Sequence, residues 1–413
     1  MKLGYRHTLA ASCIGYAVQA IINNYSPLLY VVYAEELGIS LAKISLLITL
    51  NFVIQIGMDL SGAFLIDKMS YRASVIAANI CAIAGLCSLG ILPMIMSDKF
   101  SALMIATIIS AIGGGLLEVV VSPIVEAMPK EAGFSMNFLH SFYCWGHAGV
   151  IILSTLFFSA FGIERWNILA VLWCILPLIS GILFCFVPIE TLKSEKNTRG
   201  SIGYLFGKKQ FWLLMVVMLA AGASELGMAQ WASYFAERGL GVPKMLGDIL
   251  GPCTFAISMG LGRLLFGLFG SKLKIERWMT ASFVLCIISY LMTALSPIPI
   301  LSLLGCTICG ASVALMWPGS YTLGAEILPR GGIAMFALFA LAGDIGCSVG
   351  PSIVGLVSDG VATGDIALNF GSLFDATEAA GIRLGLIFTT LIPSAALVSC
   401  LALLKIKKHG NKL

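Results

Sequence analysis

The chain has 413 residues, of which 59% are hydrophobic and only 11% are charged, and its mean hydropathy is +0.97. This composition excludes a water-soluble globular domain and predicts an integral membrane protein. The net charge is only +4, and we attribute it to membrane topology, with no nucleic acid expected as a partner.

Twelve apolar segments are long enough to cross a bilayer, because a spanning helix needs about 20 apolar residues. In chain order they cover 8–34, 41–66, 73–96, 101–128, 135–161, 166–188, 210–236, 245–270, 278–296, 298–328, 332–358 and 378–404. The first segment follows Lys2 and Arg6, as in a signal peptide, but it is longer and lacks a small-residue cleavage site. We therefore predict an all-α integral membrane protein with twelve transmembrane helices.

Basic residues flank alternate loops between these segments, which predicts the orientation of the chain. The richer group of loops contains Lys2, Arg6, Lys68, Arg72, Lys130, Lys193, Lys196, Arg199, Lys208, Lys209, Lys272, Lys274, Arg277, Arg330, Lys405, Lys407, Lys408 and Lys412; the poorer group contains Lys99, Arg165, Arg238, Lys244 and Arg383. Because loops rich in Lys and Arg stay in the cytoplasm, we predict cytoplasmic termini in a bacterial-type inner (plasma) membrane.

The longest polar segment on the basic side, Pro188 to Gln210, predicts a linker between two halves. We expect an N-terminal six-helix bundle over 1–188, a cytoplasmic linker over 189–209 and a C-terminal six-helix bundle over 210–413. Three matches in register favour a duplication: Tyr33-Ala34-Glu35 with Phe235-Ala236-Glu237, Glu126-Ala127-Met128-Pro129 with Glu326-Ile327-Leu328-Pro329, and Gly146-His147-Ala148-Gly149 with Gly343-Asp344-Ile345-Gly346.

Two six-helix halves of like orientation resemble the plan of the major facilitator superfamily, whose substrate lies between the halves near the bilayer midplane. The loop Gly62-Ala63-Phe64-Leu65-Ile66-Asp67-Lys68-Met69-Ser70-Tyr71-Arg72 resembles a degenerate form of its signature GxLaDrxGrk, and Gly267–Lys272 is the corresponding loop of the second half. The resemblance implies that these charges act as latches between helices. Plain topogenic charges are the alternative, because the positive-inside bias alone places basic residues there.

A narrower resemblance, to the fucose:proton symporter family, is dense in four of the predicted helices. It is carried by Gly114-Gly115-Leu116-Leu117-Glu118 with Ser122-Pro123, by Asn137-Phe138-Leu139-His140-Ser141-Phe142 with Gly146, and by Trp317-Pro318-Gly319-Ser320-Tyr321-Thr322-Leu323-Gly324 leading to Asp344. On that pattern Glu118 matches the membrane-embedded acid, and His140 stands where the family has Gln. The chain departs from the family in its first helix, where Pro27 takes the place of an acid.

Four acids near the middle of predicted spans are the candidate cation-coupling residues: Asp59, Glu118, Glu225 and Asp344. A charge inside the hydrocarbon is costly unless it faces the bundle interior or water, so such residues are usually functional. Asp59 follows Asn51 and Gln55 at spacings of four, which puts the three on one helical face. An acid in the second helix is also where the sodium-coupled melibiose-type carriers hold their cation, so H⁺ and Na⁺ both remain open.

Polar and aromatic side chains in the spans are the candidate substrate-binding residues. A sugar needs hydrogen-bonding groups for its hydroxyls and an aromatic face for its ring. The set is Gln19, Asn23, Asn24, Asn51, Gln55, Asn137, His140, Gln230, Trp231, Trp317 and Tyr321. The alternative is that the amides join neighbouring helices and the tryptophans pack the interior.

Charged residues near the ends of spans are the candidate gating residues: Asp67, Lys68, Arg72, Glu126, Arg263 and Glu326. Arg263 is expected to pair with Asp59 or to reach the membrane interface. The twelve cysteines lack the spacing of metal ligands, so they are expected to be reduced residues of the interior.

Together these features predict a secondary active transporter, not an enzyme, that moves a monosaccharide or related polyol by H⁺ or Na⁺ symport. No cofactor is expected, and the partners are the small solute and the bilayer, with the monomer as the functional form. Alternatives are an efflux carrier for amphipathic drugs or metabolites and a non-transporting membrane sensor.

Overall fold

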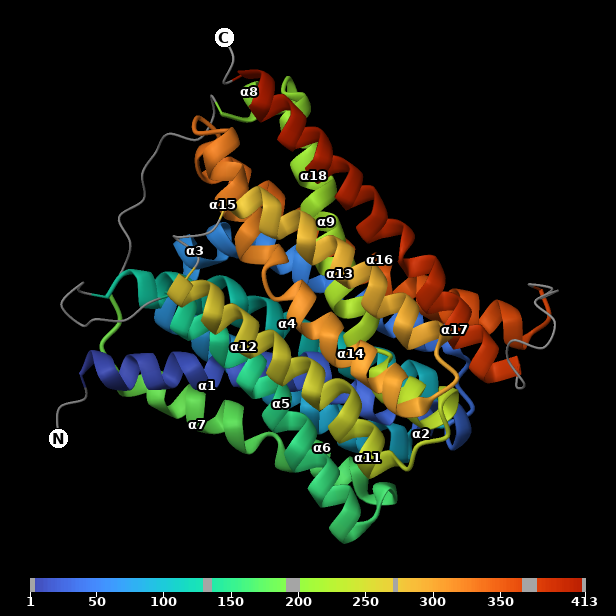
Figure 1. The fold of residues 1–413 in the computed structure, drawn as a ribbon. Coiled ribbons are helices and arrows are strands. Elements are labelled where there is room, and N and C mark those ends of the chain that lie inside the picture. Colours follow the sequence, from blue (N-terminus) through green and yellow to red (C-terminus); the bar gives the residue numbers. More distant parts are fainter. Residues whose placement is uncertain (1–3, 129–135, 191–200, 270–273, 366–376, 411–413) are drawn as a thin grey trace. The chain divides into compact units, whose positions relative to one another are not determined.

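The computed structural model describes residues 4–128, 136–190, 201–269, 274–365 and 377–410, and its regular elements in these ranges are all helices (Figure 1). The expected all-α membrane fold is confirmed. Eleven segments of the described chain are long and apolar enough to span a bilayer. The expected first span is the one that this count leaves out, because its 20-residue helix Tyr5–Asn24 contains Arg6, His7, Gln19, Asn23 and Asn24 and is less apolar than the others.

The chain divides into two compact units, which are described separately: unit 1 comprises 1–194 and 244–249, and unit 2 comprises 195–243 and 250–413. Unit 1 contains α1 (Tyr5–Asn24), η1 (Ser26–Leu29), α2 (Tyr30–Glu35), α3 (Leu41–Ile95), α4 (Lys99–Glu126), α5 (Met136–Phe161), η3 (Ile163–Arg165), α6 (Trp166–Leu172), α7 (Ile175–Phe186) and α11 (Lys244–Asp248).

Unit 2 begins with α8 (Ser201–Phe206), so the predicted linker contains a short helix. Then come α9 (Lys209–Ala229), α10 (Ala232–Tyr234), η4 (Phe235–Gly239), η5 (Ile249–Cys253, all but its first residue), α12 (Thr254–Phe269), α13 (Ile275–Leu295), α14 (Pro299–Val313), α15 (Met316–Ile327), α16 (Gly332–Ala362), α17 (Thr377–Thr389) and α18 (Leu391–Gly410).

Two local features of the sequence interrupt helices of unit 1. Pro27 lacks a backbone N–H, and the first span stops being α-helical there, continuing as the 3₁₀ turn η1 and then α2. Within α3, Ser70 has φ 69° and ψ 155°, which kinks the backbone near the start of the second of its two spanning stretches, Leu41–Ser61 and Lys68–Ile95. A positive φ is unusual for a residue with a side chain.

Glycines set how closely the helices of each unit approach. A Cβ on Gly115 of α4 would lie 2.7 Å from Met58 Cβ and 3.1 Å from Gln55 Cα, both on α3. In unit 2, a Cβ on Gly222 of α9 would lie 2.0 Å from the carbonyl oxygen of Gly343 on α16. Larger residues at these positions would push the helices apart, and with them the polar side chains that they carry.

Two arginines tie helix ends together inside their own units. Arg72 donates hydrogen bonds to the carbonyl oxygens of Phe184 and Val187, at the end of α7. Arg383 of α17 donates to the carbonyls of Ala294 and Ser296, at the end of α13. Carbonyls at a helix C-terminus have no partner within the helix, so both guanidinium groups stabilise helix ends.

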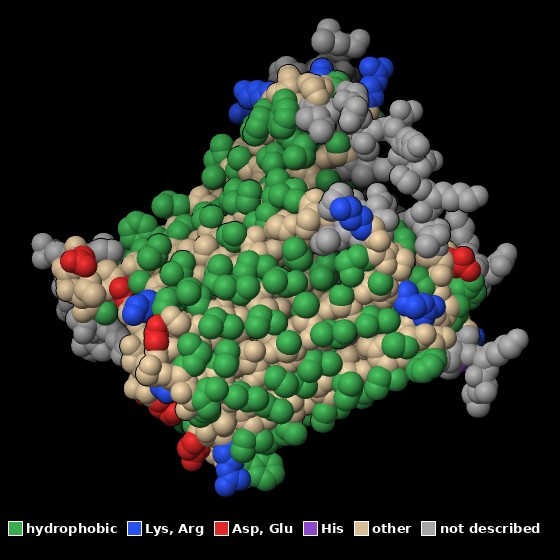
Figure 2. All heavy atoms as spheres, turned by 180° about the vertical axis from the view of Figure 1, so that it is seen from behind, with side chains coloured by type: hydrophobic (Ala, Val, Ile, Leu, Met, Phe, Trp, Pro, Cys, Tyr) green, Lys and Arg blue, Asp and Glu red, His purple; other side chains and the backbone are tan. Residues whose placement is uncertain are grey.

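The surface carries many exposed large apolar side chains, as expected where lipid replaces water. Figure 2 shows hydrophobic side chains over much of the visible face, with most of the charged side chains near its edges. This pattern agrees with a protein whose helices cross a bilayer.

Candidate functional site

Three helices of unit 1 meet at an acid cluster, which we define as Glu118 of α4, Asp59 of α3, and Gln19 and Tyr16 of α1. The Gln19 amide donates a hydrogen bond to the Glu118 carboxylate. Asp59 interacts electrostatically with both Glu118 and Tyr16. The Tyr16 hydroxyl shares a 2.7 Å hydrogen bond with Ser122, one turn further along α4.

The charged group that acts on Glu118 in this cluster is another acid, and this defines what the cluster can do. Two ionised carboxylates repel each other strongly where the dielectric constant is low. One bound proton or one monovalent cation removes that repulsion. A single positive charge at the acid cluster would therefore be stabilised by both carboxylates.

A second group, the amide cluster, consists of Asn23 of α1 with Asn51 and Gln55 of α3. Asn23 lies one turn after Gln19 on α1. The Asn23 side-chain oxygen accepts hydrogen bonds from Asn51 Nδ2 at 3.1 Å and from Gln55 Nε2 at 2.9 Å. All three side chains are buried. The predicted stripe on α3 thus faces α1, where its amides join Asn23 while Asp59 joins the acid cluster.

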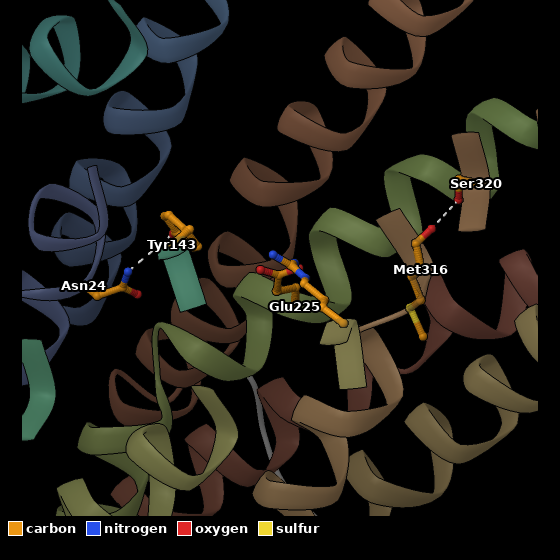
Figure 3. Close-up of polar contacts among 6 residues, drawn as sticks. Asn24, Tyr143, Glu225, Met316 and Ser320 are labelled. Carbon is orange, nitrogen blue, oxygen red and sulfur yellow. Dashed lines mark hydrogen bonds and ion pairs between the residues drawn. The ribbon is translucent and has the colours of Figure 1, made fainter. Parts of the chain in front are cut away.

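Asn24 points away from the amide cluster because it is the next residue on α1. Its amide donates to the Ala20 carbonyl at 3.0 Å and to the Tyr143 hydroxyl of α5 at 3.4 Å (Figure 3). The ring of Tyr143 lies 6.5 Å from that of His147. Asn24 therefore links α1 to α5.

In unit 2 the buried acid has a basic partner. Glu225 of α9 (Figure 3) is 4% exposed and forms an ion pair with Arg263 of α12, with 2.9 Å between Oε2 and Nη2. We expected Arg263 to pair with Asp59 or to reach the interface, and the structure gives it Glu225 as an ion-pair partner. Beside this pair, the Tyr290 hydroxyl donates to the Ser224 carbonyl at 2.8 Å.

The other predicted residues of unit 2 lie mainly in packing positions. Trp231 is fully buried and its indole donates to the Pro351 carbonyl at 2.9 Å. A Cβ on Gly343 would lie 2.3 Å from the Trp317 ring, so this indole covers the residue before Asp344. Tyr321 packs its ring 5.6 Å from that of Phe336. These contacts favour the packing alternative for the aromatic residues. Of the two predicted polar residues, Gln230 is buried and Asp344 is partly buried.

The predicted gating residues are spread over both units. Lys68, Glu126 and Glu326 are exposed, whereas Arg72 ties the end of α7, as described above. The side chains of Asp67, Asn137 and His140 lie outside the described residues, so their predicted roles stay predictions.

Reasoning from the sequence missed three polar residues of unit 1. Tyr16 precedes Gln19 and Asn23 by three and seven residues, and this helical spacing was the signal that could have found it. Tyr143 has no such signal. Asp248 of α11 is 1% exposed, accepts a 3.2 Å hydrogen bond from the Thr155 hydroxyl of α5 and forms a 3.1 Å ion pair with Lys244. Because it lies near the start of a predicted span, it was not among the mid-span acids selected from the sequence.

Comparisons with known proteins agree with this architecture. A family model described as Major Facilitator Superfamily matches residues 9–351. A search of curated proteins gave no match. A solved bacterial homologue of the human lysosomal transporter Spinster, in an inward-facing occupied conformation, is similar with a TM-score of 0.77 at 16% identity, covering 97% of each chain.

Two further solved structures are similar at the level of the fold. The nucleoside transporter NupG has a TM-score of 0.73 at 14% identity, covering 97% of this chain and 98% of its own. The E. coli fucose:proton symporter FucP has a TM-score of 0.63 at 16% identity, covering 96% of this chain and 98% of its own. With the family model spanning most of the sequence, the chain belongs to the major facilitator superfamily of transporters.

Proposed function

We propose that the protein is a secondary active transporter that carries a small polyhydroxylated solute, such as a monosaccharide, together with H⁺ or Na⁺. The acid cluster binds the coupling cation. The amide cluster contributes hydrogen bonds to the solute. The single observation that carries this proposal is the pairing of Glu118 with a second acid, Asp59, inside a membrane unit.

The reasoning for coupling is electrostatic. An acid pair that is empty of cations holds charge inside the bilayer, which disfavours closing the helices over it. A bound proton or Na⁺ neutralises the pair and permits closure. Because Gln19 contacts Glu118 and Asn23 lies one turn away on the same helix, α1 connects the cation site to the amide cluster.

The choice of solute rests on hydrogen-bonding chemistry. Amide groups can donate to and accept from hydroxyls, and α1 and α3 present three of them in the amide cluster. Two of the similar structures are named for fucose and for nucleosides, which are both hydroxyl-rich solutes. We propose the same chemical class here, with the N- and C-termini in the cytoplasm of a bacterial-type cell.

The test is transport by the purified protein in liposomes. A panel of labelled monosaccharides and nucleosides is offered under an inward H⁺ gradient, an inward Na⁺ gradient, or neither. We expect one gradient to drive accumulation of one solute class. Accumulation of none of them under either gradient would contradict the proposal.

Variants then locate the coupling site. Glu118→Gln is expected to abolish accumulation while keeping exchange of labelled for unlabelled solute, because the cation site is lost and the solute site is retained. Glu164→Gln removes an exposed acid of the same unit and is the matched control. Loss of exchange together with accumulation in Glu118→Gln would place Glu118 in solute binding instead.

The same liposomes separate import of polar solutes from efflux of amphipathic compounds. If lipophilic cations, and not sugars or nucleosides, move against their gradient, the efflux alternative is correct. A sensor would transport neither and would be insensitive to Glu118→Gln in both assays.

A further inference from the structure

A cavity of about 440 Å³ opens between α1 and α5 of unit 1, and no residue of the acid or amide cluster lines it. Its size falls in the range of about 300–1,000 Å³ that is usual for ligand sites. The residues that line it include Arg6, Ala10, Cys13, Ile14 and Ala17 of α1 and Phe142 of α5. This groove is not used by the transport mechanism proposed above.

The groove runs along one face of α1. Its lining residues on that helix recur at spacings of three and four, which places them on one side. From Arg6 to Ala17 the helix rises by about 17 Å, at 1.5 Å per residue. That length matches the thickness of one leaflet of hydrocarbon, which is about 15 Å.

The two ends of the groove differ in character. At one end Arg6 is exposed, with the exposed His7 beside it. At the other end α5 closes onto α1, since a Cβ on Gly146 would lie 2.9 Å from Ala17 Cα. The groove is therefore cationic at the Arg6 end, and it is apolar and closed at the Ala17 end.

Glu190, an acid close to this end of α1, is hydrogen-bonded to the residue before Arg6. Glu190, just beyond the end of α7, accepts a 2.7 Å hydrogen bond from the Tyr5 hydroxyl. Tyr5 precedes Arg6 by one residue, about 100° around the helix. The Tyr5–Glu190 contact ties the α7 side of α1, and Arg6 belongs to the side that faces α5.

We propose that this groove binds one acyl chain of an anionic phospholipid from the bilayer, with the lipid phosphate at Arg6. Arginine forms forked hydrogen bonds to phosphate, and the apolar walls receive the chain. The proposal concerns lipid and does not depend on the identity of the transported solute. Its consequence is that anionic lipid stabilises the α1–α5 contact, on which the position of the acid cluster depends through α1.

The test uses the full-length protein purified in a neutral detergent and titrated with phosphatidylglycerol or with phosphatidylcholine of the same chains. Thermal unfolding gives the half-saturating lipid concentration, and native mass spectrometry gives the lipid retained. We expect saturable stabilisation by phosphatidylglycerol and a clearly weaker effect of phosphatidylcholine. Equal effects of the two lipids would overturn the proposal.

Two pairs of variants place the site. Arg6→Gln is expected to raise the half-saturating phosphatidylglycerol concentration about fivefold, the equivalent of the roughly 1 kcal/mol that one arginine contributes near an anionic surface. Ala10→Trp fills the groove from an exposed position and is expected to abolish retention of lipid. The matched controls are Arg165→Gln and Ala160→Trp, at exposed positions outside the groove, and both should behave as wild type.

The outcome that overturns the proposal is specific. If Arg6→Gln and Ala10→Trp retain phosphatidylglycerol as the wild type does, the lipid is bound elsewhere. Because retention is measured on folded protein by mass, a loss of stability in either variant does not obscure the result. If the controls lose lipid to the same extent, the binding is nonspecific and the groove is not a site.

Discussion

Each unit carries an acid in a membrane helix, but the two acids have partners of opposite kind. In unit 1 Glu118 faces Asp59 and accepts a hydrogen bond from Gln19. In unit 2 Glu225 is neutralised by Arg263 at 2.9 Å. An acid beside an acid changes its charge when a cation arrives, whereas an acid beside an arginine is already compensated. We infer that unit 1 senses the coupling cation and that the ion pair of unit 2 has a structural role.

Glu225 and Asp344 were proposed as cation-coupling residues alongside Glu118 and Asp59. The arginine partner now sets Glu225 apart from the other acids, and its role in coupling stays a prediction that the following variants test.

The largest expected effect is on coupling. Glu118→Gln should reduce gradient-driven accumulation to the level of empty liposomes, because the acid cluster can no longer take up a cation. Glu225→Gln should retain the requirement for the cation gradient, even if its overall rate falls. The measurement is the accumulation ratio at a fixed gradient, normalised to the amount of inserted protein. If Glu225→Gln uncouples transport as Glu118→Gln does, the contrast between the units is wrong.

The second effect is on stability in unit 2. Arg263→Gln leaves Glu225 buried without its ion-pair partner and should destabilise the protein by about 3 kcal/mol. The double variant Arg263→Gln with Glu225→Gln should recover most of that loss, because no buried charge remains. Melting temperatures of the purified variants in one detergent provide the comparison. A double variant no more stable than Arg263→Gln alone would show that the ion pair is not the source of the effect.

A smaller effect, of opposite sign, is expected in unit 1. Glu118→Gln keeps the shape of the side chain and the hydrogen bond to Gln19, and it removes the repulsion from Asp59. At a pH where both acids are ionised, the protein should therefore gain roughly 1 kcal/mol of stability. The same melting assay at alkaline pH checks this. A large loss of stability would mean that the Glu118 charge has a compensating partner, contrary to the acid cluster as described.

The smallest expected effect is on the pH dependence of stability, and it comes from Asp98, a carboxylate outside the membrane-spanning segments. Asp98 caps α4 by accepting hydrogen bonds from the backbone N–H groups of Phe100 and Ser101, and a hydrogen bond from the Ser101 hydroxyl holds its pKa below the usual range. Because the folded-state pKa is lowered, Asp98 stabilises the fold above about pH 4, its usual pKa, and loses this effect as the pH falls further.

Asp98→Asn tests this baseline. The variant should show a slightly smaller drop in melting temperature than wild type between about pH 6 and about pH 3, where Asp98 becomes protonated. Because Asp98 is exposed, the difference should be slight. A difference as large as that produced by Arg263→Gln would mean that exposed and buried charges cannot be distinguished by this assay.

Much of the fold could be predicted from hydrophobic length alone. The expected spans correspond to the helices of the described chain, because about 20 consecutive apolar residues form a helix as long as the hydrocarbon core is thick. The break at Pro27 and the positive φ of Ser70 were not foreseen. For the candidate site, the stripe of Asn51, Gln55 and Asp59 was visible from its spacing. The division of that stripe between the amide cluster and the acid cluster was not.

By itself, the amino-acid sequence determined that the protein is a helical membrane protein, which helices carry acids, and which residues share a helical face, because each of these follows from local composition and a helical period of about 3.6 residues. Only the tertiary structure decided which partner each acid receives. Gln19 reaches Glu118 across 99 positions of the sequence, and Arg263 reaches Glu225 across 38. Those pairings depend on how closely glycines let the helices approach, and no local pattern encodes that distance.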